Sequence, residues 1–208
     1  MLGLHKHSNS ERGDTIIEVL FAISVFSLVA VGGLSLMNQG TAAAERSLEI
    51  TLVRDQVDGQ VDALQFLHSA YIASYTNGGT KISANASGTP AEQWRYIVDN
   101  KATVASPTDF TQDAQGSCNL PSGSIGSFAI EPASMRLLQA PPVQPAVYAR
   151  INASGKAEGL WIEAIGPSSA TDDSHTHFIE FYVRACWGSV GSSVPMTLGT
   201  VLRLYEPL

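Results

Sequence analysis

The sequence predicts an α+β fold in which a long N-terminal helix packs on a C-terminal antiparallel sheet of four or five strands. Three observations predict it. An apolar run near the N-terminus leads into an amphipathic helical pattern, and no proline occurs before Pro90. The C-terminal part contains short segments rich in β-branched and aromatic residues between turn residues. At 208 residues, the chain is long enough for one domain plus an appended segment.

An apolar helix is expected over residues 14–38. The stretch from Thr15 to Met37 reads TIIEVLFAISVFSLVAVGGLSLM, and its single formal charge is Glu18. As a helix, this stretch is long enough to cross a hydrocarbon core. The paired Gly32-Gly33 is its weakest point, where the helix either unwinds locally or packs closely against a neighbour.

Residues 1–13 precede this helix as a short leader. They include Lys6 and Arg12, and positive residues beside the first apolar segment favour a cytoplasmic N-terminus. We therefore expect a single-pass membrane protein whose remaining residues face outward. An outward-facing domain lies in a compartment where disulfides form.

Residues 39–75 are expected to continue the helix with an amphipathic pattern. Polar residues, Gln60 among them, alternate with apolar and aromatic ones that recur at spacings of three to five. The expected apolar stripe consists of Leu48, Leu52, Val57, Val61, Leu64, His68, Tyr71 and Tyr75. Such a stripe requires a globular partner, and the simplest is the chain's own C-terminal part.

Residues 76–126 predict a long irregular connection, because they are rich in Gly, Ser, Asn, Thr and Pro. One short apolar piece, Gln93 to Val98, interrupts this composition. Two triplets in the chain, Asn85-Ala-Ser87 and Asn152-Ala-Ser154, match the N-glycosylation sequon. Such triplets are also common by chance, and the second one is typical of a turn.

Residues 127–208 are expected to form the antiparallel sheet, with one face packed on the amphipathic half of the helix. The expected strands are Ser127 to Ile130, Ala146 to Ile151, Gly159 to Ile165, His177 to Cys186 and Thr197 to Tyr205. The segment Asn152-Ala-Ser-Gly-Lys joins two of them at the distance of a hairpin turn. Trp94, Trp161 and Trp187 are expected in the core rather than on a carbohydrate-stacking surface.

The chain has two cysteines, Cys118 and Cys186, and neither lies in a pattern with the spacing of a zinc site. A single disulfide between them in an exported domain fits their number and their distance from the N-terminal segment. It would fasten the long connection to the end of a strand. The alternative is two unrelated buried thiols in a reducing compartment.

The net charge of -7, with 12 scattered basic residues, argues against a nucleic-acid-binding surface. No Gly-rich phosphate loop, nucleophile elbow or Cys/His nucleophile pattern is present. The best candidate for a metal enzyme is TDDSHTHF, which contains Asp172, Asp173, His175 and His177. No third ligand is fixed by spacing, so a polar loop that leads into a strand is favoured. We expect no catalytic residue, no metal site and no cofactor.

The apolar N-terminal segment allows three interpretations. A secretory signal peptide could be cleaved after Ala44, in the run Ala42-Ala43-Ala44, but the apolar region is too long for one. A plain single-pass anchor would use Glu18 only to complete a capping box with Thr15, since T-I-I-E matches the S/T-x-x-E pattern. The third interpretation comes from a resemblance to a known family.

Residues 13–26, GDTIIEVLFAISVF, resemble the processing motif of type IV pilins and pseudopilins. In that family a glycine precedes the cleaved bond and a glutamate is the fifth residue of the mature chain, and Gly13 and Glu18 match these positions. The family usually has phenylalanine directly after the cut, whereas this chain has Asp14. It also often has a proline in the middle of the membrane half, which this chain lacks.

The resemblance implies that a prepilin peptidase cuts after Gly13 and that the new amine of Asp14 is methylated. Glu18 would then pair with the N-terminal amine of a neighbouring subunit as the helix leaves the bilayer, since an unpaired ion at that depth costs a few kcal/mol. A disulfide in the C-terminal region, such as Cys118 with Cys186, also agrees with the family.

The implied function is a structural subunit of a type IV pilus or pseudopilus. The implied partners are other pilin subunits, the peptidase, the assembly machinery in the membrane, and lipid before assembly. The protein would be a single-pass membrane protein first and part of an extracellular filament later. The alternative is a membrane-anchored protein with an extracytoplasmic ligand-binding domain.

Overall fold

A computed structural model of the chain describes residues 14–75, 82–102, 127–138, 148–166, 178–189 and 192–206. The chain divides into two units, Met1–Glu45 and Arg46–Leu208. Helix α1 (Asp14–Tyr75) is continuous over 62 residues and contributes to both units. Its continuity confirms that one long helix occupies the N-terminal third of the chain, including the glycine pair at Gly32-Gly33.

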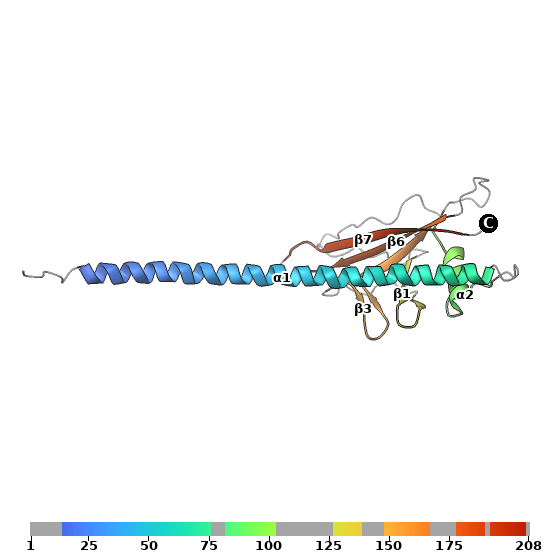
Figure 1. Cartoon of the computed structure of the whole chain (residues 1–208), viewed down its shortest axis with the longest axis horizontal. Coiled ribbons are helices and arrows are strands. Elements are labelled where there is room, and N and C mark those ends of the chain that lie inside the picture. Colours follow the sequence, from blue (N-terminus) through green and yellow to red (C-terminus); the bar gives the residue numbers. More distant parts are fainter. Residues whose placement is uncertain are drawn as a thin grey trace, which may run out of the picture. The chain divides into compact units, whose positions relative to one another are not determined.

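The second unit has the predicted α+β architecture. Five strands form an antiparallel sheet in the order β2-β1-β5-β6-β7, and β3 and β4 form a separate two-stranded hairpin. The strands are β1 (Ser127–Glu131), β2 (Arg136–Leu138), β3 (Arg150–Ile151), β4 (Ala157–Glu158), β5 (Leu160–Ile165), β6 (Phe178–Trp187) and β7 (Met196–Tyr205). Strands β6 and β7 run alongside the second half of α1 (Figure 1).

Four of the five predicted strands lie in the sheet, as β1, β5, β6 and β7. The fifth, predicted over Ala146 to Ile151, contributes only the two residues of β3 in the described part of the chain, and these pair with β4 across a turn. Its expected place in the sheet is taken by β2, a three-residue strand that follows β1 after a turn containing Met135 at φ 53. So short a strand leaves little periodicity in the sequence.

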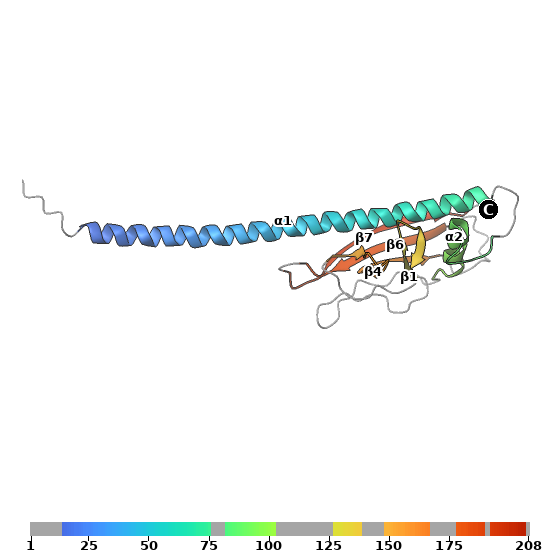
Figure 2. The same cartoon turned by 90° about the horizontal axis from the view of Figure 1, so that it is seen from below.

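Helix α2 (Pro90–Asp99) corrects the prediction that residues 76–126 are irregular throughout. Its first turn is fixed locally, because the Glu92 carboxylate accepts hydrogen bonds from the backbone N–H of Thr89 (2.7 Å) and from the Thr89 hydroxyl (3.1 Å). Pro90 occupies a position at the helix start where its ring suits the backbone. The helix lies beside the C-terminal end of α1, on the side of the sheet (Figure 2).

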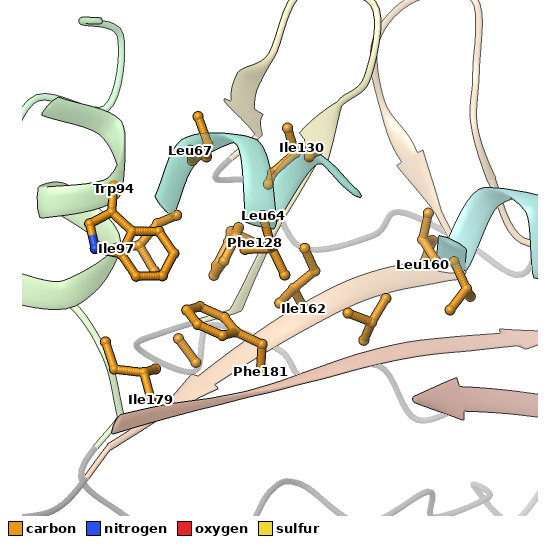
Figure 3. Packing of buried hydrophobic residues seen from close by; sticks show 14 of the residues in the cluster. Leu64, Leu67, Trp94, Ile97, Phe128, Ile130, Leu160, Ile162, Ile179 and Phe181 are labelled. Carbon is orange, nitrogen blue, oxygen red and sulfur yellow. The ribbon is translucent and has the colours of Figure 1, made fainter. Parts of the chain in front are cut away.

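The core lies between α1, α2 and one face of the sheet. Figure 3 shows side chains from α1 (Leu64, Leu67), α2 (Trp94, Ile97), β1 (Phe128, Ile130), β5 (Leu160, Ile162) and β6 (Ile179, Phe181) converging there. The Trp94 ring packs against His68, with centroids 4.8 Å apart, and against Phe181, at 5.4 Å. Trp94, Trp161 and Trp187 are all buried, which confirms their predicted place in the interior.

The predicted apolar stripe of α1 is correct from Val57 to Tyr71 and wrong at its two ends, where the last residue, Tyr75, is 38% exposed. Val57, Leu64 and Tyr71 are buried, whereas Leu48 and Leu52 are 64% and 41% exposed. The buried face instead begins one position later in each turn, at Glu49 and Val53. At the start of this face, a polar side chain of α1 forms hydrogen bonds with residues at the end of β6 and just after it.

That polar side chain is Glu49, which is 7% exposed and is the first buried residue of α1. One of its carboxylate oxygens accepts a hydrogen bond from the Ser189 hydroxyl (2.7 Å) and another from the Trp187 indole N–H (3.3 Å). Both donors follow Cys186 at the end of β6. Hydrogen bonds satisfy the buried carboxylate and join the helix to that strand end.

Gln60, expected on the polar face, is fully buried. Its side-chain amide donates to the carbonyl of Ile130 (2.6 Å), and its carbonyl oxygen accepts from the N–H of Ile130 (2.8 Å). Strand β1 pairs with β5 only at Ser127 and Phe128. At Ile130 the Gln60 side chain therefore forms the backbone hydrogen bonds that β5 does not supply. On strand β2, the Gln93 side chain accepts a hydrogen bond from the backbone N–H of Leu137 (3.1 Å).

A charged pair on β6 and β7 makes the stability of the domain sensitive to acid. Glu180 accepts hydrogen bonds from Arg203 and from the Tyr182 hydroxyl (3.0 Å). These bonds hold the pKa of the Glu180 carboxyl below its ordinary value, and the bond from Arg203 has the larger effect. Glu180 therefore binds a proton more readily in the unfolded chain than in the folded one. The free energy of unfolding falls as the pH drops through the ordinary pKa of the carboxyl and then through its lowered pKa.

We expect Glu180→Gln to remove this part of the acid sensitivity. The free energy of unfolding of the wild type should decline more steeply below neutral pH than that of the variant, as measured by denaturant titration at several pH values. If the free energies of unfolding of the wild type and the variant fell equally with pH down to the lowest pH measured, the pair would contribute nothing to the acid sensitivity.

Candidate functional site in the apolar half of helix α1

The first unit exposes a continuous apolar surface. Helix α1 is long and apolar enough to cross a membrane, and no part of its most apolar stretch is buried within the chain. The exposed large side chains are Ile16, Ile17, Val19, Leu20, Phe21, Ile23, Val25, Phe26, Leu28, Val29, Val31, Leu34, Leu36 and Met37. Burying each would gain about 1.5–3 kcal/mol relative to water, so this surface requires lipid or other helices around it.

Two serine hydroxyl groups in this stretch form hydrogen bonds within the helix. Ser24 donates to the carbonyl of Leu20 (2.7 Å), and Ser27 donates to the carbonyl of Ile23 (2.8 Å). A hydroxyl that bonds to the preceding turn needs no water, so it adds little to the cost of burial in an apolar medium. The helical backbone, these two serines and the exposed hydrophobic side chains therefore suit the apolar half to lipid.

Glu18 is the exception in this surface. Its side chain is exposed, and it makes no hydrogen bond or ion pair with the described residues. Helix α1 begins at Asp14, one helical turn before Glu18, and Thr15 lies inside the helix. No hydrogen bond joins Thr15 to Glu18 in this part of the structure, so the capping box of the plain-anchor interpretation is not formed. Gly13, the predicted processing position, lies outside the described residues.

The glycines of the apolar half have no packing role within the chain itself. A Cβ atom added at Gly32, Gly33 or Gly40 would meet nothing within 4 Å. Glycine lowers helix stability relative to alanine, and in membranes it lets the backbones of two helices approach closely. Of the two alternatives for Gly32-Gly33, local unwinding is not seen, since α1 is helical through both residues.

Other predicted site residues are only partly described. Cys186 is buried at the end of β6 and is disulfide-bonded, while its predicted partner Cys118 lies outside the described residues, so the pairing stays a prediction. The segment from Asp172 to His177 also lies outside them. In the part of the chain that the structure describes, no group of three His, Cys, Asp or Glu side chains could hold a metal ion.

A comparison with protein families, with curated proteins and with solved structures gives no match to this chain. The function of the chain is therefore inferred from its own residues. They combine an apolar helical surface of membrane-spanning length, the Glu18 carboxylate, which has no partner among the described residues, and a folded domain that packs on the second half of the same helix. The apolar surface of the first half of α1 can be buried in lipid or against other helices.

Proposed function

We propose that the protein is a prepilin-like structural subunit of a type IV pilus or pseudopilus filament. The observation that carries the proposal is the division of α1 into two parts. Its second part is covered by the sheet, whereas its first part, residues 14 to about 40, exposes every large apolar side chain and carries within the apolar run an acid, Glu18, that has no partner among the described residues. An anchor needs the apolar length alone, but a filament subunit needs the acid as well.

The proposed assembly follows from the cost of that acid. In the bilayer an isolated carboxylate at the depth of Glu18 costs a few kcal/mol. Cleavage after Gly13 creates an amine on Asp14, which is methylated, and the amine of one subunit pairs with Glu18 of the next. The apolar surfaces then exchange lipid for helix contacts, so packing drives assembly and the charge pair sets the register.

The proposed topology places residues 1–13 in the cytoplasm and the second unit outside. Lys6 and Arg12 support this orientation. Before assembly the protein would be held in the membrane by α1, where the prepilin peptidase and the assembly machinery act on it. After assembly its second unit would face the exterior of the filament. The disulfide state of Cys186 agrees with an oxidising compartment.

Intact-mass measurement tests the processing step. Full-length protein purified from membranes of a host that has a prepilin peptidase should begin at methylated Asp14 and lack residues 1–13. We expect Gly13→Val to retain the leader, because the cleaved bond follows Gly13, and the matched Gly3→Val variant to be processed like the wild type.

The rival is a single-pass anchor with an outward ligand-binding domain. It predicts that wild type and both variants keep residues 1–13 in every host. Retention of the leader in a host whose own prepilins are cleaved would therefore overturn the proposed function.

A further inference from the structure

The two sequons of the chain differ in how the fold holds their asparagines. N-glycosylation joins the side-chain amide nitrogen of asparagine to a sugar, in the sequence Asn-x-Ser/Thr. The amide must reach the transferase, and its hydrogens must not be held by another acceptor. Both conditions can be read from the hydrogen bonds of Asn85 and Asn152.

Asn85 meets both conditions. Its side chain is exposed, and its Oδ1 accepts one hydrogen bond, from the backbone N–H of Ser87 (3.1 Å). Its Nδ2 donates no hydrogen bond to any described residue, and Asn85 is not among those with further contacts. The Ser87 side chain, which completes the sequon, is exposed as well.

The backbone around Asn85 is fixed even though its amide is free. The N–H of Asn85 donates to the carbonyl of Glu92 (3.1 Å), and the N–H of Gly88 donates to the carbonyl of Asn85 (3.2 Å). A Cβ atom at Gly88 would lie 2.9 Å from Asn85 Nδ2 and 2.2 Å from a carboxylate oxygen of Glu92. Glycine at this position therefore leaves room for the amide. The sequon is presented on an ordered turn just before α2.

Asn152 fails both conditions in the folded domain. It is half-buried, and its Nδ2 donates to Glu158 Oε1 at 2.7 Å. Its Oδ1 accepts from the backbone N–H groups of Ser154 (2.9 Å) and Lys156 (3.0 Å). The bond from Asn152, followed by that from Arg150, lowers the pKa of the Glu158 carboxyl, so the acceptor is charged and the bond is strong.

We propose that Asn85 is an acceptor of an N-linked glycan and that Asn152 is not one while the domain is folded. The co-substrate is an oligosaccharide carried on a lipid pyrophosphate. In the transfer, Asn85 Nδ2 forms a bond to C1 of the first sugar. The bond from C1 to the pyrophosphate oxygen breaks, the lipid pyrophosphate leaves with the electron pair, and the amide proton passes to a base of the transferase.

In a cell this modification requires the second unit to face outward, and in that respect it rests on the proposed function. The acceptor chemistry itself depends only on the fold. An assay with purified components therefore separates the two, because it needs no particular orientation and no processing after Gly13.

The test uses the full-length chain in detergent with a single-subunit oligosaccharyltransferase of relaxed specificity and its lipid-linked oligosaccharide. The preparation is first chosen so that it glycosylates both synthetic peptides, one around Asn85 and one around Asn152. Peptide mapping of the folded protein should then find the glycan at Asn85 and only background at Asn152. Asn85→Gln and Ser87→Ala should each lose the modification.

The matched variant Ser154→Ala should leave the extent of modification unchanged, because it removes only the second sequon. Urea-unfolded protein should gain the second glycan at Asn152. Modification of folded Asn152 as fast as Asn85, or no modification of folded Asn85, would overturn the proposal.

Discussion

Replacing Glu18 by alanine is expected to abolish filament assembly while leaving membrane insertion intact. The apolar surface that holds α1 in lipid does not depend on Glu18, and removing the charge makes insertion easier. In the proposed assembly, the variant lacks the partner of the Asp14 amine. A pair worth a few kcal/mol at that depth corresponds to about a hundredfold or more in subunit association. Filaments sheared from the cells should fall to background, as measured by electron microscopy and immunoblotting.

The matched control is Glu45→Ala. Glu45 is an exposed glutamate on the same helix, outside the apolar stretch, and should not be needed for the charge pair. Membrane fractions should contain equal amounts of wild type, Glu18→Ala and Glu45→Ala. Normal filaments from the Glu18→Ala strain would show that no charge pair sets the register.

Replacing Gln60 by alanine is expected to lower the free energy of unfolding by about 2–4 kcal/mol, because it leaves the N–H and C=O of Ile130 buried without partners. Both groups bond to the Gln60 side chain, at 2.8 and 2.6 Å, inside the core. Denaturant unfolding of the full chain in detergent, followed by the fluorescence of the three buried tryptophans, measures the change.

Gln65→Ala is the control for Gln60→Ala. Gln65 lies on the same helix with its side chain exposed, so its replacement should change stability by no more than about 0.5 kcal/mol. A Gln60→Leu variant fills most of the volume but supplies no hydrogen bond, so it should remain well below the wild type. Equal stability of Gln60→Leu and wild type would mean that Gln60 acts by filling space alone.

The sequence predicts the elements of this fold better than their contacts. The long helix and four strands follow from periodicity and turn residues, which are local properties. The sequence places Gln60 on the polar face because it is one of the polar residues that alternate with the apolar ones. Its burial depends on Ile130, 70 residues away, where β1 no longer pairs with β5. No local pattern contains that information.

Helix α2 and the start of the buried face of α1 show the same limit. The Thr89-to-Glu92 signal for a helix start was present in the sequence, but the surrounding Gly, Ser, Asn and Thr indicated a loop. The sequence does not predict that the buried face begins at Glu49 instead of Leu48. A carboxylate is buried only where hydrogen-bond donors contact it, and here the donors are Trp187 and Ser189, which are distant in the sequence.

The candidate site divides in a similar way. Its apolar length and the exceptional charge of Glu18 are properties of composition, and they were predicted. The proposed partner of Glu18 belongs to another copy of the chain, so neither the sequence nor one folded chain contains it. The distinction between Asn85 and Asn152 also needed the fold, since both triplets look alike in the sequence.

The position of Glu49 has a mechanical consequence. It is the first residue of α1 that the domain encloses, so tension transmitted along the helix reaches the sheet there. The joint is a carboxylate held by an indole and a hydroxyl at the end of the strand that carries Cys186. Pulling therefore loads these two hydrogen bonds before it shears the hydrophobic layer, which begins on α1 at Val53.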